Sequence, residues 1–328
     1  MIARRRLVIA LGAGALVPLA GFTQQSAKVW RVGFLAVRRI APLDADFFSE
    51  FPRGMRELGY TEGKNLVIDW RSAEGKVERL PDLAAGLVRQ KVDVIVAAGA
   101  QAVGAAQKAT VTIPIVMGTT GDPVGSGFVK SLARPGGNIT GLSDISSDVS
   151  PKLLELLLRI VPKLSHVAVL VNPDNSSHST LLKSIRDAAQ SVGLKVTPAL
   201  ARTPQEIETA FSRITQEGAG AVIAAADGLF NQQIHQVAEL AAKRRLPTIS
   251  GFWLYPEAGG LMSYGQNFSY NFRRAAAYVD KIFRGAKPGD LPVEQPTKVE
   301  LRINRGTART LGLAITPDLL MRADQVIE

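Results

Sequence analysis

The stretch GTTGDPVGSGFVKSLARPGGNITGLSD, Gly118–Asp144, decides how the rest of the chain is organised. It follows the apolar run Ile113–Met117, which is typical of a buried strand. After small and hydroxylated residues, Asp122-Pro123 interrupts regular structure, because proline lacks a backbone N–H and restricts the residue before it. Such a stretch suits a loop between two domains, or a close backbone approach to a polar ligand. The local residues leave both interpretations open.

Strand-like and helix-like segments alternate before this stretch. Near-continuous apolar runs predict buried parallel strands, and apolar residues at helical spacing predict amphipathic helices. This rhythm predicts right-handed crossovers and a doubly wound α/β sheet. The expected strands are 29–37, 65–70, 92–98 and 113–117, and the expected helices are 46–58, 77–90 and 100–109.

The same order recurs about 135 residues further on, for example from Val32 to Val167. Thr203, Pro204 and Glu206 together predict a capped helix start. Two lobes, each built on a doubly wound parallel sheet and joined by hinge strands, are the simplest explanation. We expect lobe I at 29–143 plus about 252–290, lobe II at 144–251 plus about 291–328, and hinge strands at about 140–146 and 250–259.

Composition limits the class of protein. A chain of 328 residues, 46% of them apolar, is long enough that its core should divide into two. The absence of cysteine excludes disulfides, thiolate metal sites and a cysteine nucleophile. Histidine occurs only at His166, His178 and His235, without metal-ligand spacing. We therefore expect neither a metal nor a cofactor.

The N-terminus has the pattern of a signal peptide. Arg4–Arg6 precede the apolar run Leu7–Ala20, which is shorter than a membrane span of about 20 residues. Cleavage after residue 23 gives a signal peptide of 1–23, and cleavage after Ala27 is the alternative. The arginine cluster loosely resembles a twin-arginine signal but lacks its flanking pattern, so Sec and Tat export both remain open. The sequence predicts a periplasmic protein.

The positive charge does not indicate nucleic-acid binding. Three of the 39 basic residues lie in the expected signal peptide, and the others are spread along the chain. No basic helix carries a cluster of base-reading side chains. We interpret the chain as a basic protein without a nucleic-acid partner.

Candidate ligand residues follow from the expected topology. In open α/β sheets, ligands lie at the carboxyl ends of the strands, and two facing lobes bring all of these ends to one cleft. Aromatic side chains near the second predicted hinge could hold flat or apolar parts of a ligand, although core packing would also explain them. The candidate ligand-binding residues are Arg38, Gly99, Ala100, Gln101, Thr119, Thr120, Asn172, Asn175, Asp227, Phe230, Tyr255 and Tyr264.

An amino acid fits these candidates. Free amides at Gly99–Gln101 and the hydroxyls of Thr119 and Thr120 could hold a carboxylate. Asp227 ends a predicted strand with no basic neighbour in sequence, so it could hold the ammonium. The alternative role for Asp227 is to cap the helix that begins near Phe230.

Catalytic motifs are missing from the sequence. Gly99–Gly104 has the spacing of a phosphate-binding loop, but Ala105-Ala106 stands where that loop needs Lys-Ser/Thr. There is no G-x-S-x-G elbow, no dinucleotide-binding glycine motif after the first strand, and no evident carboxylate pair. The sequence therefore favours a binding protein over an enzyme.

Four long motifs carry a resemblance that covers essentially the whole chain: GDPVGSGFVKSLARPGGNITGLS at Gly121–Ser143, GGLMSYG at Gly259–Gly265, FRRAAAYVDKIFRGAKPGDLPVEQPTKVELRIN at Phe272–Asn304, and the C-terminal LGLAITPDLLMRADQVIE. With these motifs the chain resembles the periplasmic solute-binding proteins of ABC transporters with the type I fold. The resemblance implies a monomer that delivers a small solute to an inner-membrane permease with its ATPase. It also implies amino-acid ligands, notably aromatic ones. Arg38-Arg39 departs from the small hydroxylated residues usual at that loop, which puts the ligand chemistry there in doubt.

Three alternatives belong to other classes. The same fold serves as the effector domain of transcriptional repressors, but those carry an N-terminal helix-turn-helix where this chain has a signal-like segment. An exported enzyme using Asp122 or Asp227 would lack a paired base or nucleophile. A periplasmic sensor for a small organic acid, reporting to a membrane partner, differs from a transport protein only in its partner.

Overall fold

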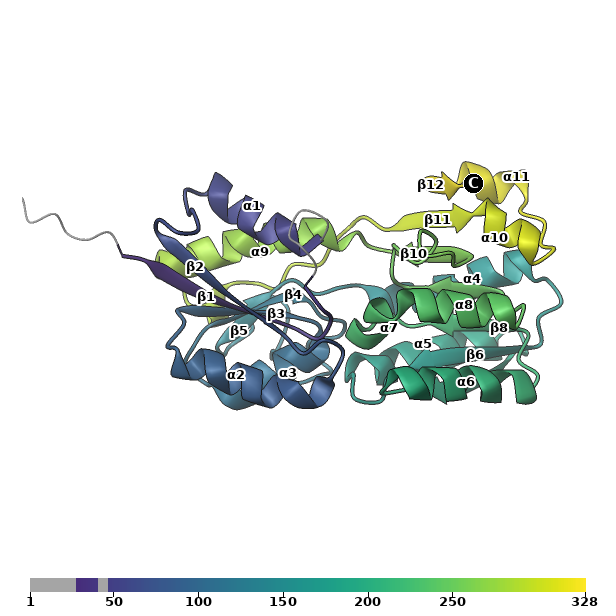
Figure 1. Ribbon diagram of the computed structural model, residues 1–328, viewed down its shortest axis with the longest axis horizontal. Coiled ribbons are helices and arrows are strands. Elements are labelled where there is room, and N and C mark those ends of the chain that lie inside the picture. Colours follow the sequence, from purple (N-terminus) through teal and green to yellow (C-terminus); the bar gives the residue numbers. More distant parts are fainter. Residues whose placement is uncertain (1–27, 41–46) are drawn as a thin grey trace, which may run out of the picture.

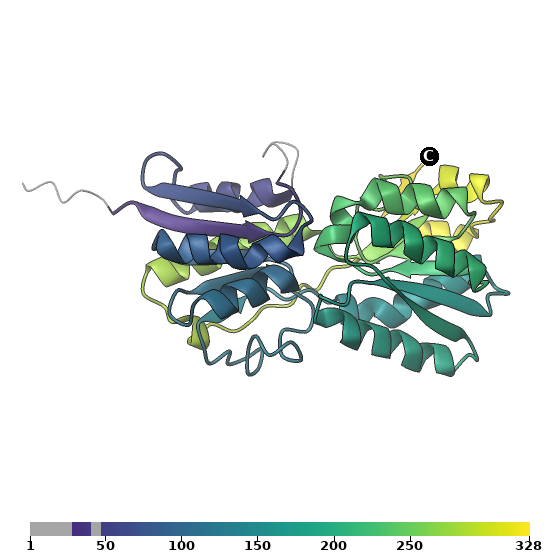
Figure 2. The same cartoon turned by 60° about the horizontal axis from the view of Figure 1, so that its bottom comes forward.

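The structure is a computed structural model that describes residues 28–40 and 47–328. The expected signal peptide, 1–23, lies outside the described residues. Within the described ranges, no helix is both long and apolar enough to cross a membrane. These ranges form two α/β lobes that lie side by side, joined by narrow connections (Figure 2).

Lobe I is built on a five-stranded parallel sheet with the order β2-β1-β3-β4-β5. Helices α1 and α9 cover one face of this sheet, and α2 and α3 cover the other (Figure 1). The strands are β1 Trp30–Ala36, β2 Leu66–Ser72, β3 Val94–Ala98, β4 Ile115–Thr119 and β5 Ile139–Gly141. The helices are α1 Glu50–Glu57, α2 Leu80–Arg89, α3 Ala100–Ala109 and α9 Phe268–Phe283, with short 3-10 turns at Phe47–Ser49, Val77–Arg79 and Pro288–Asp290.

Packing on both faces explains why the strands of lobe I are continuous apolar runs. In β1, Phe34 points into an aromatic core under α1 and α9, whereas its neighbour Leu35 points into an aliphatic core under α2 and α3. Phe34 lies against Phe48 and Phe272, with ring centroids 5.1 and 5.7 Å away. A strand buried on both sides cannot alternate apolar and polar residues.

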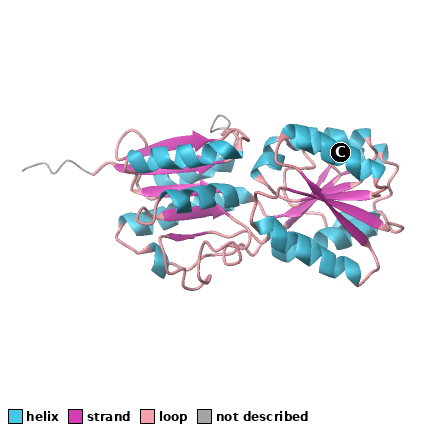
Figure 3. Cartoon of the chain, turned by 90° about the horizontal axis from the view of Figure 1, so that it is seen from below, coloured by secondary structure: helices cyan, strands magenta, loops and turns pink. Residues whose placement is uncertain are grey.

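Lobe II is built on a seven-stranded sheet with the order β12-β11-β10-β9-β8-β6-β7. All neighbouring strands are parallel except β10 and β11. Helices α4 and α5 pack on one face, and α6 and α8 on the other, so the sheet is sandwiched between helical layers (Figure 3). The strands are β6 His166–Val171, β7 Lys195–Leu200, β8 Ala221–Ala224, β9 Thr248–Ser250, β10 Met262–Gly265, β11 Glu300–Asn304 and β12 Gln325–Ile327. The helices are α4 Ser146–Ile160, α5 Ser177–Gln190, α6 Pro204–Gln216, α7 Gly228–Gln232, α8 Ile234–Lys243, α10 Arg305–Thr310 and α11 Pro317–Met321.

The start of α6 confirms the predicted cap. The Thr203 hydroxyl accepts a hydrogen bond from the Glu206 amide at 3.1 Å, and Pro204 is the first helical residue. The Glu206 carboxylate accepts in turn from the Arg202 amide at 2.8 Å, one residue before the N-cap. These bonds satisfy amides that have no partner within the helix.

The chain crosses between the lobes at three places. The crossings run from β5 to α4, from β10 to α9 at Gln266 and Asn267, and from the turn at Pro288–Asp290 to β11. The expectation of a hinge at 250–259 is wrong, because β10 pairs with β9 and keeps residues through Gly265 in the sheet of lobe II. Of the segment expected in lobe I at 252–290, the part that follows β10 packs there, chiefly as α9, and the rings of Phe252 and Trp253 also join the lobe I aromatic core.

Candidate functional site

The carboxyl ends of strands from both lobes meet at one cavity. With the lobes in this arrangement its volume is about 50 Å³, room for a few water molecules. Its walls come from the loops after β1, β3 and β4 of lobe I and after β6 and β8 of lobe II, together with the crossing into α4 and the start of α9. The lining residues are Val37, Arg38, Phe47, Phe48, Ala98, Gly99, Ala100, Gln101, Thr119, Thr120, Gly121, Asp144, Ser146, Asn175, Ser177, His178, Ala226, Asp227, Gly228, Asn231 and Phe268.

On the lobe I side, the turn from β3 into α3 presents the start of a helix to the cavity. Gly99 has a φ of 95°, a left-handed conformation that favours glycine, and its amide donates to the Thr119 carbonyl at 2.9 Å. The first amides of α3 have no partner within the helix. Gln101 follows in the first turn, and its buried Oε1 has no hydrogen-bond partner among the described residues. This turn can therefore receive an anionic group and, at Gln101 Oε1, a donor.

On the lobe II side, Asp227 is the centre of a polar network. Its Oδ1 accepts from the Leu229 amide at 2.8 Å, which makes it the N-cap of α7, and from Asn172 Nδ2 at 3.2 Å. Its Oδ2 accepts from Asn175 Nδ2 at 2.9 Å and from Gln101 Nε2 at 2.7 Å. The carboxylate is 4% exposed, so these four donors take the place of water. The capping role is present, and it is one part of a larger network.

His178 fixes the geometry around this network. Its Nδ1 accepts from the Asn172 amide at 2.8 Å, so its Nε2 carries the proton toward the Ala226 carbonyl, 3.2 Å away. The ring thereby ties the loop after β6 to the loop after β8. Phe230 lies behind it, with the two ring centroids 6.4 Å apart.

The remaining wall of the cavity is aromatic and carries one guanidinium. Phe47, Phe48 and Phe268 line it. The Arg38 guanidinium carbon lies 4.3 Å from the centroid of the Phe47 ring and 4.7 Å from that of Phe48. Stacking of this kind favours the flat guanidinium of arginine. The cavity therefore offers rings for an apolar group and one cation near them.

Asp144 is a second carboxylate in the cavity. Withdrawal from solvent raises the pKa of Asp144, and this effect outweighs the hydrogen bonds from the Ser146 amide and hydroxyl, which lower it. Because Asp144 belongs to the crossing from β5 to α4, opening of the cleft would change its solvation.

The lobes touch across the cleft. Besides the Gln101–Asp227 bond, the Ser177 hydroxyl donates to the Gly121 carbonyl at 2.6 Å, and the Thr180 hydroxyl donates to Asp122 Oδ2 at 2.6 Å. The contact is close at Gly228, where an added Cβ would lie 2.6 Å from the Cβ of Val37 in lobe I. The arrangement is a closed one.

Most residues predicted from the strand ends lie where the sequence placed them. Arg38, Gly99, Ala100, Gln101, Thr119, Thr120, Asn175 and Asp227 line the cavity. Asn172 lies one step behind them and donates to Asp227.

Three aromatic candidates do not line the cavity. Phe230 and Tyr255 are buried in the core between the sheet of lobe II and helices α6 and α8. Burial raises the pKa of Tyr255. Tyr264 lies on β10 and packs against the aliphatic core of lobe II. All three belong to segments expected at a hinge or strand end, but these segments turn their rings toward lobe II.

The aromatic rings that do face the cavity were missed as ligand residues. Phe47 and Phe48 lie in the segment 46–58, whose pattern predicts a helix, and Phe268 belongs to no motif. The position of Phe268 at the start of α9, directly after a crossing, would have been the only pattern that could find it. Within the described part of the chain, no group of three histidine or acidic residues is arranged to hold a metal ion.

A family model and a known protein each match most of this chain. A family model described as ABC transporter substrate binding protein matches residues 45–327. A protein named tyrosine-binding protein, from Clostridioides difficile (strain R20291), is 28% identical over 263 residues, which are 80% of this chain and 75% of that protein.

Two solved structures differ in how well they match. An ABC domain in complex with L-Trp, from Streptococcus pneumonia, has a TM-score of 0.84 at 24% identity, covering 91% of this chain and 99% of that one. A ligand-free, open substrate-binding protein with adhesive properties, from Clostridium difficile, has a TM-score of 0.63 at 26% identity with the same coverage. The lower score against the open structure agrees with the closed arrangement described above.

Proposed function

Because this chain belongs to the family of ABC transporter substrate-binding proteins, we propose that it captures an amino acid in the cleft between its lobes and delivers it to a membrane permease. The permease would work with an ATPase partner, and the binding protein would act in the periplasm after removal of residues 1–23. No catalysis is part of this role.

The observation that carries the proposal is the buried Asp227 at the contact between the lobes. Gln101 Nε2 donates to Asp227 Oδ2, while Gln101 Oε1 has no partner among the described residues. An ammonium group entering here would donate to both oxygens and would replace a hydrogen bond from a neutral amide with hydrogen bonds from a cationic donor. Because one oxygen belongs to each lobe, the amine would join the lobes.

The carboxylate of the same amino acid would lie at the start of α3. The N-terminus of α3, with its free first-turn amides, lies at the cavity, and Thr119 also lines it. The side chain would then face Phe47, Phe48 and Phe268. Flat rings suit this wall, and the ligands that name two of the similar proteins, tyrosine and L-Trp, are aromatic amino acids.

Solute exchange requires the cleft to open. The closed cavity, about 50 Å³, is too small to admit an amino acid without movement of the lobes or of the Arg38 side chain. Narrow crossings permit a hinge motion, and a solute with higher affinity for the closed form stabilises that form. Small-angle scattering should therefore show a smaller radius of gyration with saturating solute, and an unchanged radius would contradict hinge closure.

A thermal-shift screen followed by calorimetry of the mature protein tests the proposal. L-Tyrosine, L-tryptophan and L-phenylalanine should raise the melting temperature, whereas their deaminated analogues should do so much less. If no α-amino acid binds, or if amino acids and deaminated analogues bind equally, the proposed amino-acid site is wrong.

One observation favours a second candidate, a periplasmic sensor or binding protein for a small organic acid. The Asp227 carboxylate is already satisfied by four donors, and the cavity also contains the Arg38 guanidinium. A carboxylate without an amine could bind at Arg38 and leave this network intact. Preferential binding of the deaminated analogues in the same screen would support this candidate.

A further inference from the structure

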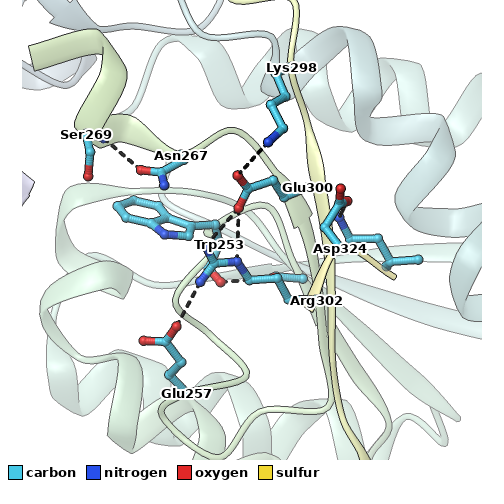
Figure 4. Close-up of polar contacts among 10 residues, drawn as sticks. Trp253, Glu257, Asn267, Ser269, Lys298, Glu300, Arg302 and Asp324 are labelled. Atoms are coloured by element: carbon cyan, nitrogen blue, oxygen red, sulfur yellow. Dashed lines mark hydrogen bonds and ion pairs between the residues drawn. The ribbon is translucent and has the colours of Figure 1, made fainter. Parts of the chain in front are cut away.

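A second cavity lies where the three crossings meet. Its volume is about 470 Å³, and it shares no lining residue with the cleft cavity. We call it the hinge cavity. It is lined by Leu142, Gln266, Asn267, Tyr270, Glu294, Gln295, Pro296, Thr297, Lys298 and Glu300. Figure 4 shows part of its rim, with Asn267 at the start of α9 opposite Lys298 and Glu300.

A buried amide in the wall of the hinge cavity lacks hydrogen bonds. Gln266 is 3% exposed, and neither its Oε1 nor its Nε2 has a partner among the described residues. A buried amide without partners costs free energy, which a ligand with matching groups would recover. The matching groups are an N–H donor and a carbonyl acceptor side by side, as on the edge of a lactam.

The charged residues of the hinge cavity are already paired. The Glu294 carboxylate receives two hydrogen bonds from the Arg274 guanidinium, at 2.7 and 2.6 Å. Glu300 lies between Lys298, at 3.6 Å, and the Arg302 guanidinium, at 2.8 Å (Figure 4). These lining residues therefore present no unpaired charge that would select a charged ligand. The cavity therefore favours a neutral ligand.

We propose that the hinge cavity binds a small, neutral, flat heterocycle with a lactam or amide edge. The Gln266 side chain, whose polar atoms are buried, turns toward the cavity to pair with this edge, and the ring lies against the apolar surfaces of Leu142, Pro296 and Tyr270. Nothing in this proposal depends on the identity of the solute in the cleft.

The position of the hinge cavity couples it to lobe closure. Two of the crossings are bonded to each other, because the Ser143 amide donates to the Glu294 carbonyl at 2.9 Å and the Glu294 amide donates to the Gly141 carbonyl at 3.0 Å. The remaining crossing, at Gln266, faces this pair across the cavity. Since the cavity has this shape in the closed arrangement, its ligand stabilises that arrangement and strengthens solute binding in the cleft. By reciprocity, the solute strengthens binding of the ligand in the hinge cavity by the same factor.

An NMR titration of the mature protein with 2-pyridone tests the site. 2-Pyridone presents the required N–H and carbonyl, and 1-methyl-2-pyridone is the same ring without the donor. For a ligand of this size we expect a Kd of about 1 mM for 2-pyridone, and binding about tenfold weaker for the methylated compound. Gln266→Leu should abolish this preference, and Tyr270→Ala, at an exposed position, should weaken 2-pyridone binding without affecting folding.

Asn271→Leu is the matched control for Gln266→Leu. Asn271 is also a buried amide with both polar atoms unpartnered among the described residues, but it does not line the hinge cavity. 2-Pyridone should bind Asn271→Leu as it binds the wild type. The proposal is overturned if 2-pyridone does not bind the wild type, or if it binds Gln266→Leu with unchanged affinity and preference.

A second titration separates this proposal from the proposed function. With saturating L-tyrosine, the Kd of 2-pyridone should fall about fivefold or more, within the usual range of coupling between sites. If L-tyrosine binds but leaves the Kd of 2-pyridone unchanged, the coupling is refuted. If no amino acid binds while 2-pyridone still does, the hinge site stands and the proposed function fails.

Discussion

The two lobes contribute different chemistry to one cleft. The wall from lobe II is a hydrogen-bonded network around Asp227, in which the asparagine amides and His178 are held by other residues of the same lobe. The wall from lobe I and the start of α9 consists of rings and the stacked guanidinium of Arg38. The lobe II wall is therefore fixed before a solute arrives, whereas the lobe I wall has side chains that can move to make room.

The same contrast holds in the cores. The core under α1 and α9 is rich in phenylalanine, and its rings continue through Phe48 and Phe268 to the cleft. The core under α4 and α5 is almost entirely aliphatic. An aromatic ring near the cleft can thus belong to a wall or to a core, and the two roles predict different effects of mutation.

Tyr255→Ala should have the largest effect, and on stability. Tyr255 is 1% exposed in the core of lobe II, so truncation should lower the free energy of unfolding by about 3–5 kcal/mol. Solute affinity of the folded fraction should stay near that of the wild type. Urea denaturation and calorimetry measure the two quantities, and a loss of affinity without a loss of stability would place this ring in the wall after all.

Asp227→Asn tests the lobe II wall of the cleft. The amide oxygen can still cap α7, but the charge partner of the amine is lost, so affinity for the amino acid should fall by about 2–5 kcal/mol. Affinity for the deaminated analogue should change little. Asp174→Asn, an exposed change on the neighbouring loop, is the matched control for calorimetry. Normal binding by Asp227→Asn would leave Asp227 with only its capping and structural roles.

Phe47→Leu tests the lobe I wall of the cleft, and Phe230→Leu, which changes a ring packed behind that cleft, is its comparison. Phe47 lines the cavity and is half-buried, so loss of its ring should weaken the binding of an aromatic solute by about 0.5–1.5 kcal/mol. Phe230→Leu should lower the melting temperature and leave the Kd unchanged, because its ring packs behind His178. The assignment of the walls is reversed if Phe230→Leu alters the Kd and Phe47→Leu does not.

Thr180→Val tests the contact between the walls. The Thr180 hydroxyl donates to Asp122 Oδ2 across the cleft. Loss of one such hydrogen bond should destabilise the closed form relative to the open form by about 0.5–1.5 kcal/mol. We expect a larger radius of gyration without solute and up to tenfold weaker binding. Thr209→Val, whose hydroxyl bonds only within α6, should change neither. Identical scattering from Thr180→Val and the wild type would show that this bond does not hold the lobes together.

The alternation of strands and helices, and the residues at the strand ends, could be predicted from local patterns in the sequence. Strands buried on both faces must be apolar throughout, and helix periodicity and caps such as Thr203 act over a few residues, so both are visible locally. Since ligands lie at the carboxyl ends of parallel strands, Gln101, Thr119, Asn175 and Asp227 could be predicted once the strands were found.

Local patterns could not predict which rings face the cleft or where the chain crosses between the lobes, because both depend on tertiary packing. Tyr255 and Phe268 both follow strands of the second half, yet one packs under α8 and the other lines the cavity. The pairing of β10 with β9 places the second crossing beyond Gly265, whereas the sequence predicted it at 250–259. Such choices depend on contacts between segments far apart in sequence, whose packing energies no local pattern contains.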